Sequence, residues 1–143
     1  MPNVTTLGTF DLPHYGHLNL LKRCYELGMV TVGLNTDHFI KNYKGKPPIM
    51  NYEERRLFLN SSGYVHKVIP NDQSSVGSSS LRTIIQAKTE LIVIGSDWAK
   101  KDYLGQLGIT VEDLEENGLS LMYVPYTQGI STTEIKRRVC ELA

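Results

Sequence analysis

Two histidines three residues apart, His14 and His17, are the side chains near the N-terminus best suited to chemistry. They belong to the segment Gly8-Thr9-Phe10-Asp11-Leu12-Pro13-His14-Tyr15-Gly16-His17, between a β-rich run and a helical pattern. A helix start offers free N–H groups and the positive end of its dipole, and both favour phosphate. Both imidazoles can point at one anion from the first helical turn. Gly16 lets a ligand approach the backbone without a side chain in the way.

The two histidines also have other interpretations. They could bind a metal ion, but the sequence offers no third ligand at a useful spacing. They could be unrelated residues on a helix surface, which fits each histidine alone but not the whole segment. The combined pattern therefore favours a phosphate-binding site.

Other residues with suitable chemistry lie outside this segment. Ser131 and Glu134 have capping-box spacing, which predicts the start of the last helix and a second set of free N–H groups. Asp97 follows a predicted strand, where its carboxylate can accept from a base amino group or a substrate hydroxyl, or cap the next segment. Asp11 can contact a metal ion or form a turn at the helix entrance, and the sequence favours neither role.

Short β-rich runs alternate with helical patterns along the chain. The alternation predicts parallel β-α-β units, hence an α/β fold with a doubly wound, Rossmann-like parallel sheet, in one domain over residues 1–143. Five strands are expected, at residues 4–7, 30–34, 64–69, 91–94 and 119–124. Ligands bind beyond the carboxyl ends of strands in such sheets, which is where residues 8–17 begin. Residues 42–49 and the Ser-rich residues 71–80 are predicted to be irregular, the former because prolines exclude a helix interior.

Composition limits the class of protein. The chain has 143 residues, 15 basic and 15 acidic, so its formal net charge is zero. That balance, without a basic stripe and interleaved aromatics, argues against a nucleic-acid partner. No apolar stretch reaches the roughly 20 residues of a membrane span, and the N-terminus lacks a signal-peptide profile. Cys24 and Cys140 are expected to be buried thiols in a cytoplasmic protein.

Residues 8–17 resemble the H-x-G-H signature of the cytidylyltransferase-like nucleotidyltransferases. Residues 129–136, Gly-Ile-Ser-Thr-Thr-Glu-Ile-Lys, resemble the second signature of that superfamily, which opens a helix against the nucleotide phosphates. Residues 95–98, Gly-Ser-Asp-Trp, are similar to a segment of the glycerol-3-phosphate cytidylyltransferases. The resemblance covers nearly the whole chain, in the right order and at the right length.

The resemblance implies an enzyme in which a phosphomonoester oxygen attacks the α-phosphate of a nucleoside triphosphate in line, releasing pyrophosphate. CTP and glycerol 3-phosphate are the implied substrates. His14, His17 and Lys44 are the implied catalytic residues, since this reaction needs positioning and charge neutralisation rather than a general base. Mg²⁺ is expected to bridge phosphate oxygens, with Asp11 as its one candidate protein ligand. Relatives are commonly homodimers, so a homodimer is expected.

The other implied contacts fall into two groups. Nucleotide-binding residues are expected at strand ends and in the two signatures: Gly8, Thr9, Phe10, Gly16, Asp97, Gly129, Ile130, Ser131, Thr132 and Thr133. The resemblance places Asp11, Lys46 and Arg55 near the acceptor and its phosphate. A structural alternative for Arg55 is an ion pair with Glu54 or Asp102.

The chain departs from the subfamily pattern in three places. Tyr126 stands where an arginine usually precedes the second signature, and a phenol cannot replace the charged guanidinium fork. Arg82 and Lys100 are candidates to supply that contact. Gly63 stands where a second arginine is common, and residues 71–80 replace a tryptophan-bearing loop. These differences concern the base and the acceptor, so an adenylyltransferase using ATP with another small phosphate is the alternative.

A non-catalytic nucleotide-binding module is the alternative from another class. Such a module would be expected to lose a histidine or the Ser-Thr-Thr run, and this chain keeps both. A redox Rossmann domain is disfavoured because no G-x-G-x-x-G follows the first strand, and a P-loop enzyme because its motif does not occur. Release of pyrophosphate would separate the enzyme from every binding-only interpretation.

Overall fold

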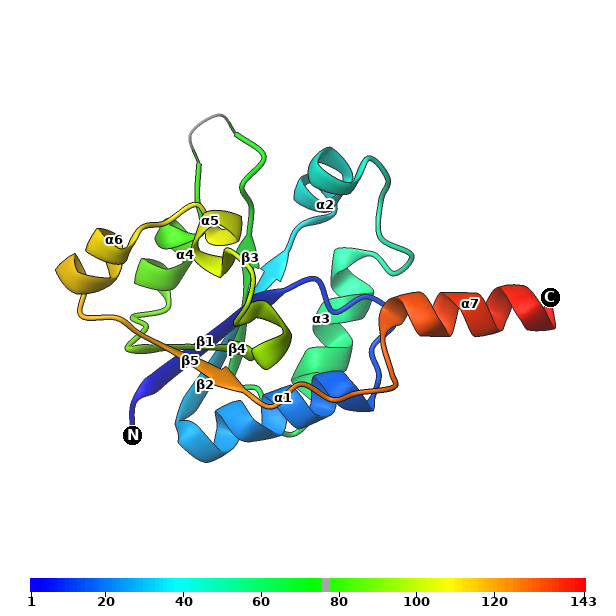
Figure 1. Ribbon diagram of the computed structural model, residues 1–143, viewed down its shortest axis with the longest axis horizontal. Helices are drawn as coiled ribbons and strands as arrows, with labels where there is room; N and C mark the ends of the chain where they lie inside the picture. Colours follow the sequence, from blue (N-terminus) through cyan, green and yellow to red (C-terminus); the bar gives the residue numbers. More distant parts are fainter. Residues whose placement is uncertain (76–77) are drawn as a thin grey trace.

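A parallel five-stranded sheet lies at the centre of the computed structural model, which describes residues 1–75 and 78–143. The strands are β1 (Asn3–Gly8), β2 (Met29–Asn35), β3 (Lys67–Asn71), β4 (Leu91–Gly95) and β5 (Ser120–Val124). The helical elements are α1 (Tyr15–Leu27), α2 (Asp37–Lys44), α3 (Tyr52–Ser61), α4 (Leu81–Gln86), the 3-10 turn η1 (Ser96–Trp98), α5 (Tyr103–Leu107), α6 (Val111–Glu116) and α7 (Thr132–Leu142). The order β3-β2-β1-β4-β5 confirms the predicted doubly wound sheet (Figure 1).

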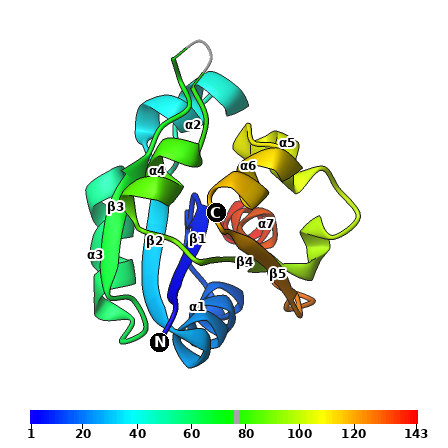
Figure 2. The ribbon, with the colours of Figure 1, turned by 90° about the vertical axis from the view of Figure 1, so that its left-hand side faces the viewer.

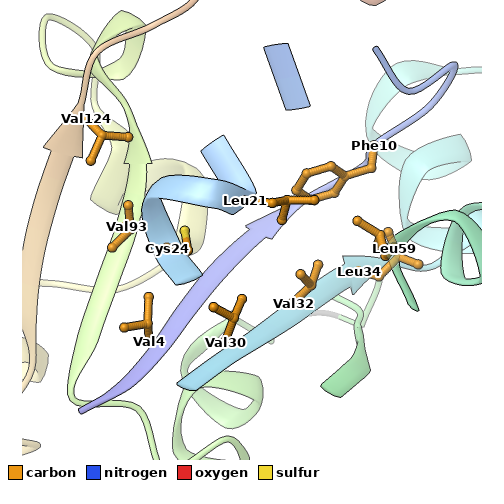
Figure 3. Packing of buried hydrophobic residues seen from close by; sticks show 10 residues of the cluster. All are labelled: Val4, Phe10, Leu21, Cys24, Val30, Val32, Leu34, Leu59, Val93 and Val124. Carbon is orange, nitrogen blue, oxygen red and sulfur yellow. The ribbon is translucent and has the colours of Figure 1, made fainter. Parts of the chain in front are cut away.

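Helices cover both faces of the sheet, as Figure 2 shows from the side. On one face Val4 packs in a cluster with Leu21 and Cys24 of α1 (Figure 3). On the other face Leu7 packs with Ile84 of α4 and with residues of α5. Successive strand residues alternate between the two faces, so burial on both sides explains the apolar character of the strands.

The sheet opens between its first and fourth strands. Six residue pairs join β1 to β2, but β1 pairs with β4 only at Val4–Leu91 and Thr5–Ile92. Toward their carboxyl ends β1 and β4 therefore part. This is also where the winding of the chain reverses, the place where open α/β sheets bind ligands.

The main differences from the predicted elements lie at β3 and at α2. β3 begins at Lys67 instead of residue 64, because Tyr64 lies in the turn after Gly63 and packs against Tyr25, with 5.7 Å between ring centroids. α2 occupies residues 37–44, so Lys44 is the last residue of a helix and not part of a loop. Gly45 ends that helix with a left-handed φ of 79°. The sequence patterns did not predict this helix or the short helices α5 and α6.

The C-terminal helix α7 projects away from the rest of the protein (Figure 1) and has no buried residue. Cys140 of α7 is exposed while Cys24 of α1 is buried, so the prediction of two buried thiols was wrong for Cys140. An apolar face on a helix indicates that the face can be buried, but it does not show that other residues of this chain pack against it. Among the described residues no helix has the length and apolar character needed to cross a membrane.

Candidate active site

A cavity of about 310 Å³ lies at the carboxyl ends of the strands, where β1 and β4 part. Both signatures contribute to its wall, together with the segment after β4. The predicted site residues that line it are Gly8, Thr9, Phe10, His14, Gly16, His17, Asp97, Ser131 and Thr132. The other predicted residues lie outside this lining, and several of them hold the lining in place.

The two signature histidines form the cap of α1. His14 Nδ1 accepts from the Gly16 N–H at 3.1 Å, and His17 Nδ1 accepts from the His14 N–H at 3.1 Å. The rings stack with 3.9 Å between centroids. Because each Nδ1 is an acceptor, each neutral ring carries its proton on Nε2. The cap thus leaves two Nε2–H donors for a ligand in the cavity.

Burial keeps both imidazoles uncharged. Desolvation lowers the pKa of His14, and it lowers the pKa of His17 to about 3, helped by His14 and opposed by Asp11. At neutral pH the pair therefore donates hydrogen bonds without adding positive charge. The charge that balances a triphosphate must come from other residues.

The ammonium groups of three lysines from two segments, Lys44 and Lys46 at the end of α2 and Lys136 on α7, lie near one another. Partial desolvation lowers the pKa of Lys44, and the nearby ammonium groups of Lys136 and Lys46 lower it further, against the effect of Asp11. Lys44 and Lys46 are exposed and lie outside the cavity lining, whereas Tyr43, whose ring is 5.7 Å from the Lys44 ammonium, lines it. Lys136 belongs to the second signature, and the sequence alone did not indicate a role for it. Its position on α7, five residues after Ser131, was the available signal.

Asp11 joins three segments of the site. Its carboxylate accepts from the N–H groups of Leu12, Ile49 and Met50 at 3.1, 2.8 and 2.9 Å, and it is 6% exposed. Its carbonyl oxygen accepts from the Thr132 hydroxyl at 2.6 Å. Of the two roles left open by the sequence, the structure shows the structural one. Asp11 holds residues 49–50, which follow Lys44 and Lys46, and the start of α7 against the first signature.

Arg55 is fully buried beneath the first signature. Its guanidinium donates to the carbonyls of Met50, Thr9 and Asn35 at 2.8 to 2.9 Å and pairs with Asp37 at 2.6 Å. The structure thus gives Arg55 a positioning role in place of the predicted acceptor-phosphate contact. The alternative pairing with Glu54 or Asp102 is also wrong, because the anionic partner is Asp37.

Gly16 makes room for a side chain of the site itself. A Cβ at this position would lie 2.9 Å from His14 Cε1 and 3.4 Å from Ile130 Cγ2. The expected reason for the glycine, ligand approach, is therefore replaced by packing of the first signature against the second. Gly129 has a φ of 81° and directs the chain so that Ile130 is buried there.

The start of α7 carries the second signature. Ser131 Oγ accepts from the Glu134 N–H at 3.0 Å, so Ser131 caps the helix as predicted. The Glu134 carboxylate pairs with Arg137 instead of the cap, so only half of the capping box forms. Thr132 faces the cavity and Thr133 is exposed. Free N–H groups of this first turn stand near the histidine pair, an arrangement suited to an anion.

The wall after β4 includes Tyr126, which stands where the subfamily usually has an arginine. Asp97 lies over Gly95, where a Cβ would be 2.6 Å from Asp97 Oδ1. Tyr126 lines the cavity, and its N–H donates to Ser96 Oγ at 3.1 Å. Neither Arg82 nor Lys100 is among the described residues that line the cavity.

Buried amides at the ends of β2 and β3 were missed. Asn71 Nδ2 donates to Asn35 Oδ1 at 2.9 Å, and Asn35 Nδ2 donates to Thr9 Oγ1 at 3.0 Å. Both asparagines line the cavity, as do Gln73 and Gln106. A polar residue ending a buried strand was a usable signal, and it was applied only to Asp97.

Comparison with known proteins agrees with this geometry. The family described as cytidylyltransferase-like matches residues 5–138. The glycerol-3-phosphate cytidylyltransferase of Bacillus subtilis (strain 168) is 36% identical over 144 residues, covering 99% of this chain and 100% of that protein. The protein of the same name from Staphylococcus aureus (strain NCTC 8325 / PS 47) is 34% identical, covering 97% of this chain and 96% of that protein.

A solved structure shows the same fold. The lipopolysaccharide core biosynthesis protein from Thermoplasma volcanium GSS1 has a TM-score of 0.61 and 25% identity, with 87% of this chain and 97% of that chain covered. The match of sequence family and fold extends across both signatures and the sheet between them. This chain belongs to the cytidylyltransferase-like family.

Proposed function

We propose that this protein transfers a cytidylyl group from CTP to glycerol 3-phosphate and releases pyrophosphate. The observation that carries the proposal is the pairing of two neutral histidine Nε2–H donors with the free N–H groups of a second helix start, at one cavity. Two relatives bearing the name of this activity match nearly the full length of the chain.

The reaction follows from the charges of its partners. An oxygen of the acceptor phosphate forms a bond to the α-phosphorus while the bond from that phosphorus to the leaving oxygen breaks. The nucleophile is already anionic near neutral pH, so no proton has to be removed. His14 and His17 donate to the oxygens that gain charge, and Lys44, Lys46 and Lys136 balance the charge of the phosphates.

Mg²⁺ is part of the proposal as a partner of the substrate. Among the described residues no three His, Cys, Asp or Glu side chains gather as a metal site, and the Asp11 carboxylate is engaged with backbone N–H groups. Phosphate oxygens of the substrate would therefore hold the ion, and the ion would lower the charge of the triphosphate. The protein's own part is to hold those phosphates at the histidines and at the start of α7.

A cytoplasmic homodimer is also proposed. Ile135, Val139 and Leu142 lie along one side of α7, and Val139 and Leu142 are 60% and 88% exposed. A second copy of the chain would cover this surface. Sedimentation equilibrium should give twice the chain mass, and a monomer at micromolar concentration would contradict the assignment.

Pyrophosphate release tests the activity. The assay pairs each of the four nucleoside triphosphates with glycerol 3-phosphate and with sugar and pantetheine phosphates, in the presence of Mg²⁺. Turnover restricted to CTP and glycerol 3-phosphate is expected. Turnover with ATP and another acceptor would keep the mechanism and replace the substrates. No turnover with any pair would favour a binding module.

A further inference from the structure

One face of the short helix α5 is turned to the cavity. Tyr103, Gln106 and Leu107 all line it, and their spacing of three and four residues places them on the same side of the helix. Asp102 caps the helix by accepting from the Gly105 N–H at 2.9 Å. The face is therefore held in a fixed orientation toward the cavity.

The segment after β3 lies against the end of this helix. The Ser80 N–H donates to the Leu107 carbonyl at 2.8 Å, and Gln73 Nε2 donates to Ser80 Oγ at 2.6 Å. Gln73 also lines the cavity. These bonds place Gln73 next to the end of α5. We call the three polar lining residues Gln73, Tyr103 and Gln106 the amide wall.

The amide wall has polar atoms without partners. The Tyr103 hydroxyl is one of two buried side-chain groups that find no hydrogen bond among the described residues, and Tyr103 is 3% exposed. Among the described residues, neither the Gln106 side-chain amide nor Gln73 Oε1 makes a hydrogen bond, whereas Gln73 Nε2 donates to Ser80 Oγ. A buried hydroxyl without a partner is costly, and a ligand group that pairs with it removes that cost.

The chemistry of the amide wall fits hydroxyl groups better than phosphate or a cation. Two amides and a phenol are neutral, and burial raises the pKa of Tyr103, so its hydroxyl keeps its proton. Amides and phenols both donate and accept, as hydroxyl groups do. A phosphate would find the lysines at the other part of the site, and a cationic head group would find no counter-charge on this wall.

The remaining part of the cavity suits the nucleoside. On the α1 side it is lined by Leu20, Pro125 and Tyr126, which offer flat apolar and aromatic surface. A planar base gains from such contacts, whereas a polyol does not. In-line transfer requires the acceptor to reach the α-phosphate on the side opposite the leaving pyrophosphate, in space that the nucleoside does not occupy. The amide wall is therefore left for the acceptor.

We infer that Gln73, Tyr103 and Gln106 bind the free hydroxyl groups of the phosphorylated alcohol and so select a polyol phosphate as acceptor. The inference rests on the proposed function and names residues that decide its acceptor specificity. They are specificity residues, since the hydroxyl groups that they bind take no part in the transfer.

Two variants and two acceptors test this role. Tyr103→Phe removes one hydroxyl, Gln106→Leu removes one amide, and Gln86→Leu, at an exposed position outside the cavity, is the matched control. Each is assayed with CTP and either glycerol 3-phosphate or propyl phosphate, which keeps the attacking phosphate but lacks the hydroxyls. Circular dichroism checks that each variant is folded.

Both cavity variants should lower kcat/KM for glycerol 3-phosphate about tenfold, mainly through KM, because each loses a hydrogen bond to the substrate. Their kcat/KM for propyl phosphate and KM for CTP should match the control. Unchanged discrimination between the two acceptors in either folded variant would overturn the inference, as would an equal loss with both acceptors. Should Tyr103→Phe fail to fold, Gln106→Leu decides by the same criterion. If the unmodified protein does not use glycerol 3-phosphate at all, the proposed function fails first, and the inference with it.

Discussion

The two helices that begin at the signatures differ in how they are held. α1 begins at a cap made by two partly buried histidines, and its Leu21 and Cys24 are buried in the core. α7 begins at Ser131, has no buried residue and projects from the protein (Figure 1). Both starts nevertheless contribute to one cavity.

Because the two helices are held differently, substitutions in them should affect stability and activity to different degrees. Packing against the sheet fixes α1, so its histidines are placed by the same contacts that stabilise the fold. The start of α7 is placed by a few bonds at its edge: Thr132 to Asp11, Asn19 to Thr127, and the contact of Ile130 with Gly16. Loss of an α7 contact should therefore reduce activity more than stability, and five experiments test this difference.

The largest effect is expected from His17→Ala. Loss of one Nε2–H donor should lower kcat by about 100-fold or more, because that donor faces charge that grows in the transition state. The cap of α1 is weakened as well, by about 1 kcal/mol. His38→Ala, an exposed histidine on α2, is the control and should keep the parent rate. An unchanged kcat in folded His17→Ala would remove the first signature from the chemistry.

Asp11→Ala should reduce the free energy of unfolding by about 2–3 kcal/mol, measured by urea denaturation. The substitution leaves three backbone N–H groups without their acceptor in a nearly buried place. Asp11→Asn keeps one acceptor oxygen and should lose about half as much. Equal stability of all three proteins would show that Asp11 does not join the segments.

The free energy of unfolding should decrease in mild acid because the folded protein disfavours protonation of His17. Its pKa is near 3 in the folded protein and about 6.5 unfolded, so below pH 6.5 the unfolded chain binds a proton that the folded one does not. Between pH 7.5 and 5.5 this should remove about 1.4 kcal/mol. His17→Gln should show a shallower dependence over that range. Parallel curves for the two proteins would contradict the lowered pKa.

Thr132→Val should reduce kcat/KM up to about tenfold while lowering the free energy of unfolding by no more than about 1 kcal/mol. It removes the hydroxyl that ties α7 to Asp11 and keeps the shape of the side chain. Thr132→Ser, which keeps the hydroxyl that donates to the Asp11 carbonyl, is the matched control and should behave like the parent. A loss of stability as large as that of Asp11→Ala, with normal turnover, would reverse the proposed distinction between the helices.

The smallest expected effect is a difference in reactivity between the two cysteines. In the native protein a thiol reagent should react with the exposed Cys140 and leave the buried Cys24 unmodified until the protein unfolds. Burial also raises the pKa of the Cys24 thiol, to about 12, which slows reaction further. Mass spectrometry of labelled peptides distinguishes the two sites. Equal labelling would show that α1 is not packed as described.

Local patterns predicted much of the fold because their causes are local. The apolar runs predicted the strands, and the Ser131–Glu134 spacing predicted the start of α7, where Ser131 caps the helix. The start of the third strand was predicted three residues too early, and α2 was not predicted. Tyr64 has strand-like chemistry but packs in a turn, and Lys44 has a Gly-Pro-rich neighbourhood but ends a helix.

The sequence by itself determined the doubly wound fold, the family and the two signatures that meet at the cavity. Only the tertiary structure decided what individual side chains do there. Arg55 is buried and holds backbone carbonyls in place, and the absence of a side chain at Gly16 leaves room for the His14 ring. Asp11 accepts hydrogen bonds that join three segments. These roles depend on groups that are 38 to 121 residues apart for Asp11 and 46 for Arg55 and Thr9. Burial and partners at such separations arise only when the chain is folded, so residue type and spacing alone could not specify them.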